Sequence, residues 1–74
     1  MTLKQFIEAD ETEQAEAVWR GVQINERDDG IHTILLYKVD SFYVEVYYHK
    51  QHNVIKKLEA LDESQLTLYT DRKN

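Results

Sequence analysis

The sequence predicts an α+β domain in which an N-terminal helical segment packs on one face of a four-stranded antiparallel meander sheet. Apolar residues recur at helical spacing up to Trp19, and from Val22 to Ala60 they alternate with polar residues as in strands. Three turn signals divide the alternating region, and the pairings that they imply place apolar side chains on one common side. With 74 residues and no cysteine, the chain is expected to form a single domain, residues 1–74, around one core.

Two capping boxes mark the helical segment. Thr2 and Asp10 are each followed three residues later by Gln or Glu, a spacing with which side chains close the first turn of a helix. We therefore expect a short helix at residues 3–8, a bend, and a second helix at residues 11–20. A single bent helix over residues 3–20 is the alternative.

The first hairpin is expected at Asp29-Gly30. This pair is typical of a two-residue type I′ turn, because both positions need positive φ. Such a turn places Val22 and Ile24 on the core side of the sheet. Gly21, just before the first strand, is expected to end the second helix in the left-handed conformation.

The second hairpin is expected at Asp40-Ser41. A two-residue turn there brings Leu35 opposite Val46, so that one side of both central strands is apolar. The expected core consists of Leu3, Phe6, Ile7, Val18 and Trp19 from the helices and Ile24, Leu35, Val44, Val46 and Leu58 from the sheet.

The third hairpin is expected to end at Asn53 in the left-handed conformation, with Lys50 paired to Val54 and Leu58 on the core side. The following tail is ambiguous. Residues 64–70 alternate like a strand, whereas the residues after Asp62 also suit a short helix with Leu66 and Tyr69 one turn apart. We favour the helix.

The side of the sheet away from the helices carries more apolar residues than an exposed face needs. Ile34, Leu36, Tyr43 and Tyr47 lie together on the two central strands. One interpretation is that these cross-strand pairs stabilise the sheet, under the C-terminal segment. The other is a contact surface for a second copy or another protein. On the second interpretation, the predicted function is a small non-enzymatic protein–protein interaction module, with a homodimer through this open face as one form.

A small-ligand- or metal-binding protein is the alternative function. The pairing of the second hairpin sets His32 opposite His49, and His52 follows in the next loop, so three imidazoles gather at one end of the sheet. No cysteine or acidic pair completes a recognisable metal motif, so neither a metal nor another cofactor is expected. The cleft beside Trp19 is the second place considered for a ligand.

No catalytic constellation is visible, and no enzymatic activity is expected. Glu45 is the one acid in the aromatic strand, and its nearest expected partners, Lys38 and Lys57, make it part of a surface ion pair instead of a general acid. The serines lack a nucleophile-elbow context, and both glycines have structural explanations.

Charge and hydropathy argue against other classes of partner. The net charge of −5 disfavours nucleic acid, because neutralising phosphates needs clustered lysine and arginine. No apolar run approaches the length of a membrane span or of a secretory signal. Together with the lack of cysteine, this favours a cytoplasmic protein.

Five segments carry a resemblance: Trp19–Gly21, Arg27, Leu36–Tyr37, Phe42–Val46 and Tyr48–His49. Together they resemble the pattern of a group of short uncharacterised bacterial proteins of about this length, which have an N-terminal helical segment and an F-Y-V-E strand. The resemblance spans the whole chain. It implies a bacterial, stand-alone small protein, and it implies no activity, cofactor or site residue.

Overall fold

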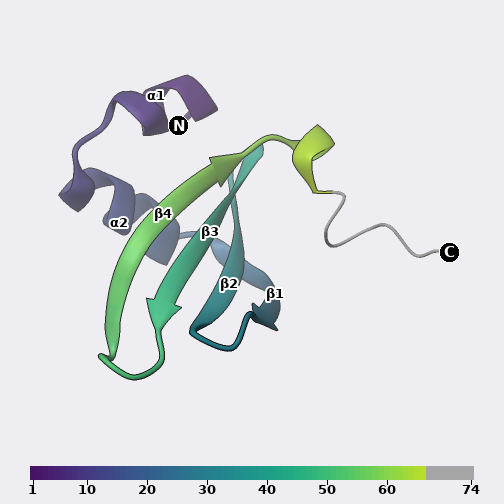
Figure 1. Ribbon diagram of the computed structural model, residues 1–74. Helices are drawn as coiled ribbons and strands as arrows, with labels where there is room; N and C mark the ends of the chain where they lie inside the picture. The colour runs from purple at the N-terminus through teal and green to yellow at the C-terminus, as the bar shows by residue number, and fades with distance from the viewer. Residues whose placement is uncertain (67–74) are drawn as a thin grey trace, which may run out of the picture.

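Two helices are followed by four strands that form one antiparallel sheet. The computed structural model describes residues 1–66, in the order α1 (Leu3–Glu8), α2 (Glu11–Trp19), β1 (Val22–Asp28), β2 (His32–Val39), β3 (Phe42–His49), β4 (Val54–Leu61) and the 3₁₀ turn η1 (Glu63–Gln65). The strand order is β1-β2-β3-β4, and both helices lie on one face of the sheet (Figure 1). The predicted α+β meander is confirmed.

Both capping boxes form, and they separate the two helices. The Thr2 hydroxyl accepts a hydrogen bond from the Gln5 N–H at 3.1 Å, and the Asp10 carboxylate accepts one from the Glu13 N–H at 2.8 Å. In return, the side chains of Gln5 and Glu13 accept from the N–H groups of the two cap residues. Each box satisfies N–H groups that a helix start leaves unpaired. Two helices, and not one bent helix, are therefore confirmed.

Gly21 is needed for a different reason from the one predicted. Its φ does not lie in the left-handed region, where Gly30 lies with φ 94°. A Cβ atom at Gly21 would lie 2.5 Å from the carbonyl oxygen of Lys38 and 3.1 Å from a methyl group of Val39. The prediction of a left-handed helix end is therefore wrong. The glycine instead lets the connection from α2 to β1 pass directly against the backbone of β2.

The hairpin of β2 and β3 forms as predicted. Leu35 lies opposite Val46, and the turn at Asp40-Ser41 has Asp40 in the left-handed region with φ 54°. Because successive side chains of a strand point to opposite faces, this register fixes the face of every residue on the two central strands.

The turn between β1 and β2 is longer than the predicted two-residue turn. Asp28 lies opposite Thr33. The Asp29 carboxylate accepts hydrogen bonds from the N–H groups of the two residues that follow Gly30, at 2.9 and 2.6 Å. The Asp29 N–H also donates to the His32 carbonyl oxygen at 3.2 Å, so backbone and side-chain bonds of Asp29 together close this turn.

The register of β1 is displaced in consequence. Arg27 lies opposite Ile34, two residues further along β2 than predicted. A bulge at Ile24 then shifts the start of the strand, so that Val22 lies opposite Lys38 and leaves the core side. Val22 is 64% exposed and Ile24 is 48% exposed. The prediction that these two residues belong to the core is wrong.

The pairing of β4 with β3 matches the prediction in its second half. Leu58 lies on the core side, and Asn53 is left-handed with φ 59°, as expected. The loop is one residue longer than predicted, because His49 and not Lys50 lies opposite Val54.

A bulge in β4 accounts for the difference. Lys56 is the extra residue, since Lys57 pairs with Tyr47 while Ile55 pairs with Tyr48. Ile55 therefore shares the face of Tyr48, which is the face that carries the helices.

The core lies between the helices and the central strands. Phe6 from α1 and Val18 from α2 are at most 1% exposed and pack with Val44 and Val46, and the Phe6 ring lies 5.4 Å from that of Phe42. Leu3, Leu35 and Leu58 pack against this cluster and are partly buried. Burial of each large apolar side chain contributes roughly 1.5–3 kcal/mol, so these few contacts hold the two layers together.

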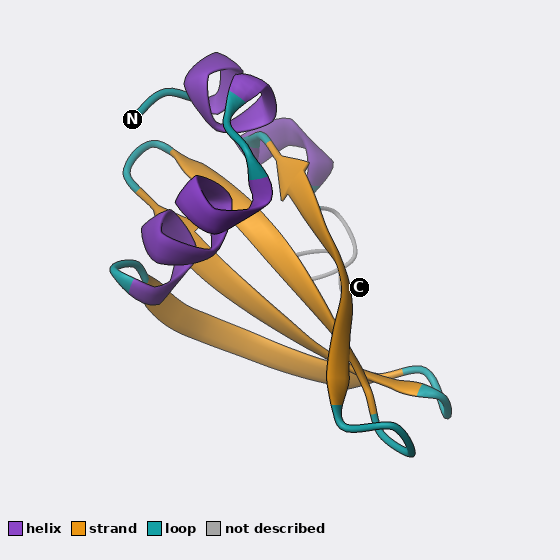
Figure 2. Ribbon diagram, turned by 90° about the vertical axis from the view of Figure 1, so that its left-hand side faces the viewer, coloured by secondary structure: helices purple, strands orange, loops and turns teal. Residues whose placement is uncertain are grey.

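Two helix residues that were predicted to be buried are exposed. Ile7 is 62% exposed and Trp19 is 53% exposed. The helices lie over the end of the sheet near the β2–β3 turn, and the end with the other two loops extends beyond them (Figure 2). Part of the helix-side face is therefore not covered by the helices.

The described chain ends in a single 3₁₀ turn instead of a longer helix. The Gln65 side chain accepts a hydrogen bond from the Asp62 N–H at 2.9 Å, which is the capping interaction expected there. Leu66 is 8% exposed and packs on the face of the sheet opposite the helices. The predicted position of Tyr69 lies outside the described residues.

Candidate functional site

The face of the sheet opposite the helices is largely enclosed within the single chain. Ile34 and Leu36 are each 1% exposed and Tyr43 is 9% exposed, and only Tyr47 among the four predicted contact residues is half-buried. Leu66 packs on Leu36 and Tyr43. The structure brings the four residues together, but the expectation of an open face is not met.

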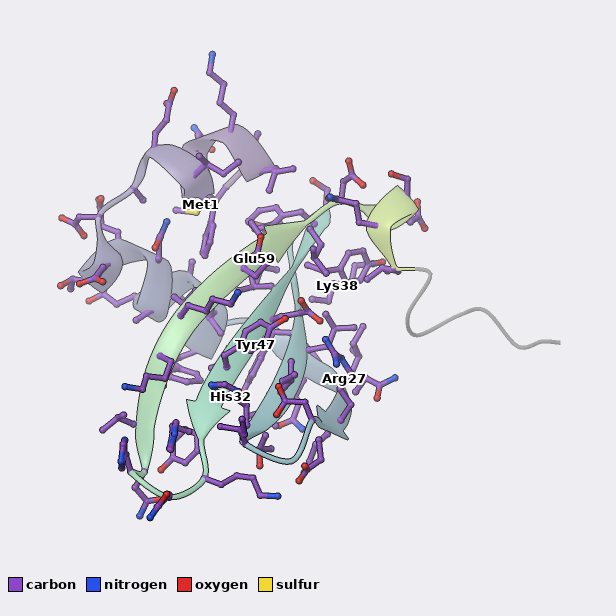
Figure 3. The ribbon with its side chains drawn as sticks, in the orientation of Figure 1. Met1, Arg27, His32, Lys38, Tyr47 and Glu59 are labelled. Carbon is purple, nitrogen blue, oxygen red and sulfur yellow. The ribbon has the colours of Figure 1, made fainter. Side chains whose placement is uncertain are left out.

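A buried ion pair lies on the same face. The Glu45 side chain is 5% exposed, and its carboxylate accepts hydrogen bonds from the Arg27 guanidinium at 3.1 Å and from the Tyr47 hydroxyl at 3.2 Å. Arg27 comes from β1 and Tyr47 from β3, and both are labelled in Figure 3. The predicted surface ion pair with Lys38 or Lys57 is wrong, because the displaced register of β1 carries Arg27 to Glu45.

The chemistry of this network is that of a structural contact. Burial, followed by the negative charge of Glu45, raises the pKa of the Tyr47 phenol above its ordinary value of 10.0. The phenol is therefore held in its neutral form, in which it donates to Glu45. Both carboxylate oxygens of Glu45 are used by neighbours, as buried charges require.

The three predicted histidines do come together, but not as metal ligands. The rings of His49 and His52 stack at 4.1 Å, and that of His32 stands edge-on to His49 at 5.5 Å. The Nδ1 atom of His49 accepts a hydrogen bond from the His52 N–H. The Nδ1 atom of His32 is hydrogen-bonded to the Asp29 carboxylate at 3.2 Å. Within residues 1–66, no group of three or more acidic, histidine or cysteine side chains is arranged to hold a metal ion.

Acidification is expected to weaken the fold at this end of the sheet. Partial removal from water, followed by the charge of His52, lowers the pKa of His49 below its ordinary value of 6.5. The unfolded chain thus binds this proton more readily, so the stabilisation is complete above the unfolded pKa and is lost as the pH falls through the folded pKa. Urea denaturation from about pH 7 to about pH 5 should show a falling free energy of unfolding.

A His49→Asn variant is the matched control for this titration. The Asn side-chain oxygen can accept the same hydrogen bond as Nδ1, but it does not titrate. The pH dependence should be smaller in the variant than in the wild-type chain. An unchanged dependence would assign the effect to other groups.

A groove lies between α2 and β4, on the helix side of the sheet. It has a volume of about 260 Å³ and is lined by Glu11, Gln14, Ala15, Val18, Trp19, Ile55, Lys56, Lys57 and Leu58. The Trp19 ring is held edge-on against Tyr37 at 5.7 Å and leaves half of its surface open. The cleft that the sequence suggested beside Trp19 is therefore present.

The groove combines an apolar interior with charged rims. Val18 and Leu58 line it from the core, and Ile55, which is 42% exposed, extends it towards the uncovered end of the sheet. The α2 rim carries the acid Glu11, and the β4 rim carries the two lysines. An exposed aromatic ring beside apolar side chains, with charges around them, is the composition of a protein contact site.

One residue of this region, Ile55, could not be placed correctly from the sequence. A regular alternation of β4 puts it on the face opposite the helices. The adjacent lysines Lys56-Lys57 were the available signal, since they interrupt the alternation at the position of the bulge.

Two further findings bear on identity. No helix among the described residues is long and apolar enough to cross a membrane. The resemblance to short bacterial proteins stays a prediction. Comparison with known proteins finds no matching model of a protein family, no matching curated protein and no matching solved structure.

Proposed function

We propose that this chain is a small, non-enzymatic protein–protein interaction module of the cytoplasm, and that it binds its partner at the groove between α2 and β4. The observation that carries the proposal is the position of Trp19. Trp19 is 53% exposed at the side of a groove that continues to the exposed Ile55. Tryptophan is among the residues that contribute most to binding when a partner covers them.

The size of the groove favours a macromolecular partner over a small ligand. Its volume of about 260 Å³ lies below the roughly 300–1,000 Å³ of ordinary ligand pockets. A partner that extends over Ile55 and the uncovered end of the sheet buries more apolar surface than a small molecule within the groove. The buried network at Glu45 offers no competing site, because its polar atoms already serve one another.

Trp19 provides the readout for a test, because it is the only tryptophan of the chain. The chain is immobilised, proteins that bind are recovered from an extract, and each purified candidate is titrated while the Trp19 emission is recorded. A partner that covers the groove should shift the emission to shorter wavelength as the indole leaves water.

The matched variants are Ile55→Glu and Val22→Glu. Both place an acid at an exposed apolar position of an edge strand, but Val22 lies in β1, on the opposite edge of the sheet. Ile55→Glu should weaken binding about tenfold or more, equal to about 1.4 kcal/mol, and Val22→Glu should leave it unchanged. Equal binding by all three proteins, or binding without an emission shift, contradicts the proposed site.

A further inference from the structure

β4 forms one edge of the sheet beside the groove, and its charges are complementary to those of a second, antiparallel β4 strand. β4 is the last strand of the described sheet, so the backbone groups on its outer side face no further strand. We infer that the partner is a second copy of this chain, joined by antiparallel pairing of the two β4 strands about a two-fold axis at Leu58. This inference rests on the proposed function.

The geometry of antiparallel strands limits where the axis can lie. Residues that face each other across such a pair both point their N–H and C=O groups towards the partner strand, or both point them away. In a strand that pairs with its own copy, opposite residues must therefore be an even number of positions apart. A two-fold axis must pass through a residue and not between two residues.

Charge selects Leu58 among these residues. With the axis there, Lys57 of each copy lies directly opposite Glu59 of the other copy. An axis at Lys56, Lys57 or Glu59 would instead set that residue against itself, like charge against like charge. Axes nearer to either end of the strand make no charged pair within β4.

Both charged groups are on the surface, where a second copy can reach them. Lys57 and Glu59 form an ion pair at 3.6 Å within the strand, Lys57 also lies 4.5 Å from the centre of the Tyr47 ring, and their side chains remain 56% and 50% exposed (Glu59 is labelled in Figure 3). Within the chain Glu59 lies directly opposite Glu45, another acid. Like charges at directly opposite positions destabilise a sheet, and a lysine from a second copy on the other side of Glu59 offsets this repulsion.

The lysines of β4 then oppose pairing with most strands but permit pairing with a second β4 strand. Lysine on an edge strand normally discourages pairing with other chains. Here Lys57 meets an acid of the partner strand, because Glu59 follows two residues after Lys57 in the same sequence and lies opposite it in the second copy. The paired sheets would be continuous across the interface, with the helices of both copies on one side, since the axis is perpendicular to the sheet.

Sedimentation equilibrium of the purified chain, from about 1 µM to about 1 mM, tests the proposal. The wild-type chain should form a dimer. The Lys57→Glu and Glu59→Lys variants should each raise the dissociation constant about tenfold or more, because two attractive pairs become two repulsive ones. The variant Glu26→Lys, an exposed acid of the opposite edge strand β1, is the control and should dimerise as the wild-type chain does.

Mixing the two single variants gives the sharpest result. Lys57→Glu places acids at both positions, and Glu59→Lys places lysines at both positions. A mixed pair therefore has opposite charges at each contact and should form a heterodimer, although each variant alone does not. The double variant Lys57→Glu, Glu59→Lys should also dimerise. Circular dichroism establishes that each variant is folded.

Several outcomes overturn this pairing. They are a monomeric wild-type chain at the highest concentration, a mixture that does not form a heterodimer, or a loss of dimerisation in the Glu26→Lys control. A monomeric chain that still binds another protein, with sensitivity to Ile55→Glu, leaves the proposed function standing without self-pairing. A dimer that leaves Trp19 emission unchanged, together with binding that does not depend on Ile55, overturns the groove and leaves the strand pairing.

Discussion

Replacing Phe6 by alanine is expected to lower the free energy of unfolding by about 3–5 kcal/mol. Phe6 is the one buried residue of α1, and it is 1% exposed. Its removal leaves a cavity between α1 and the sheet and takes away the ring that packs on Phe42. For 74 residues the whole stability is roughly 4–11 kcal/mol, so the variant should be close to unfolding at room temperature. Urea denaturation followed by circular dichroism measures the loss.

Ile7→Ala is the matched control for this substitution. Ile7 follows Phe6 in the same helix and shares its helical context, but it is 62% exposed. Its truncation should change the free energy of unfolding by no more than about 0.5 kcal/mol. If the two variants lose the same amount, α1 does not depend on Phe6 for its attachment to the sheet.

Removing the Glu45 side chain is expected to cost about 1–3 kcal/mol of stability. Glu45→Ala leaves the Arg27 guanidinium and the Tyr47 hydroxyl without the carboxylate that accepts their hydrogen bonds. The loss is smaller than the roughly 3–5 kcal/mol of a fully buried pair, because the Arg27 side chain is 32% exposed and regains water. Denaturant unfolding at neutral pH provides the measurement.

Two further variants separate burial from charge. Glu59 lies directly opposite Glu45, but its side chain is 50% exposed. Glu59→Ala should therefore lower the free energy of unfolding by less than about 0.5 kcal/mol. The double variant Arg27→Met, Glu45→Leu replaces both charges by apolar groups and should lie near the wild-type stability. A Glu45→Ala loss no larger than that of Glu59→Ala would show that the ion pair contributes little.

The registers of the three hairpins show what the sequence could and could not predict. The β2–β3 register follows from the Asp40-Ser41 turn, because the alternation on both sides leaves one compatible pairing. The β1–β2 register does not follow from Asp29-Gly30. Hydrogen bonds from the His32 and Ile31 N–H groups, which lower the pKa of Asp29 to about 2, stabilise a longer turn that competes with the two-residue turn. Local sequence cannot rank the two turns, because both use an aspartate and a glycine.

The candidate site was predictable only in part, for a related reason. The position of Trp19 at the end of an amphipathic helix suggested a cleft beside it. The contribution of Ile55 depends on the bulge at Lys56, which reverses the face of the residues before it. A C-terminal segment over Leu36 and Tyr43 was one of two interpretations of that face, and Leu66 does pack there, but alternation along single strands could not decide between this cover and an open face.

Because β3 is enclosed on both faces, the centre of the sheet should resist local opening more strongly than the edge strand β1. Phe42 to Val46 are buried whichever way their side chains point, whereas six of the seven residues of β1 are exposed. Amide protons of the central hairpin should exchange with deuterium only when the whole chain unfolds, while those of β1 exchange through local fraying. The margin of the sheet can therefore detach and rejoin while the centre persists, and substitutions along that margin should be the easiest to accumulate.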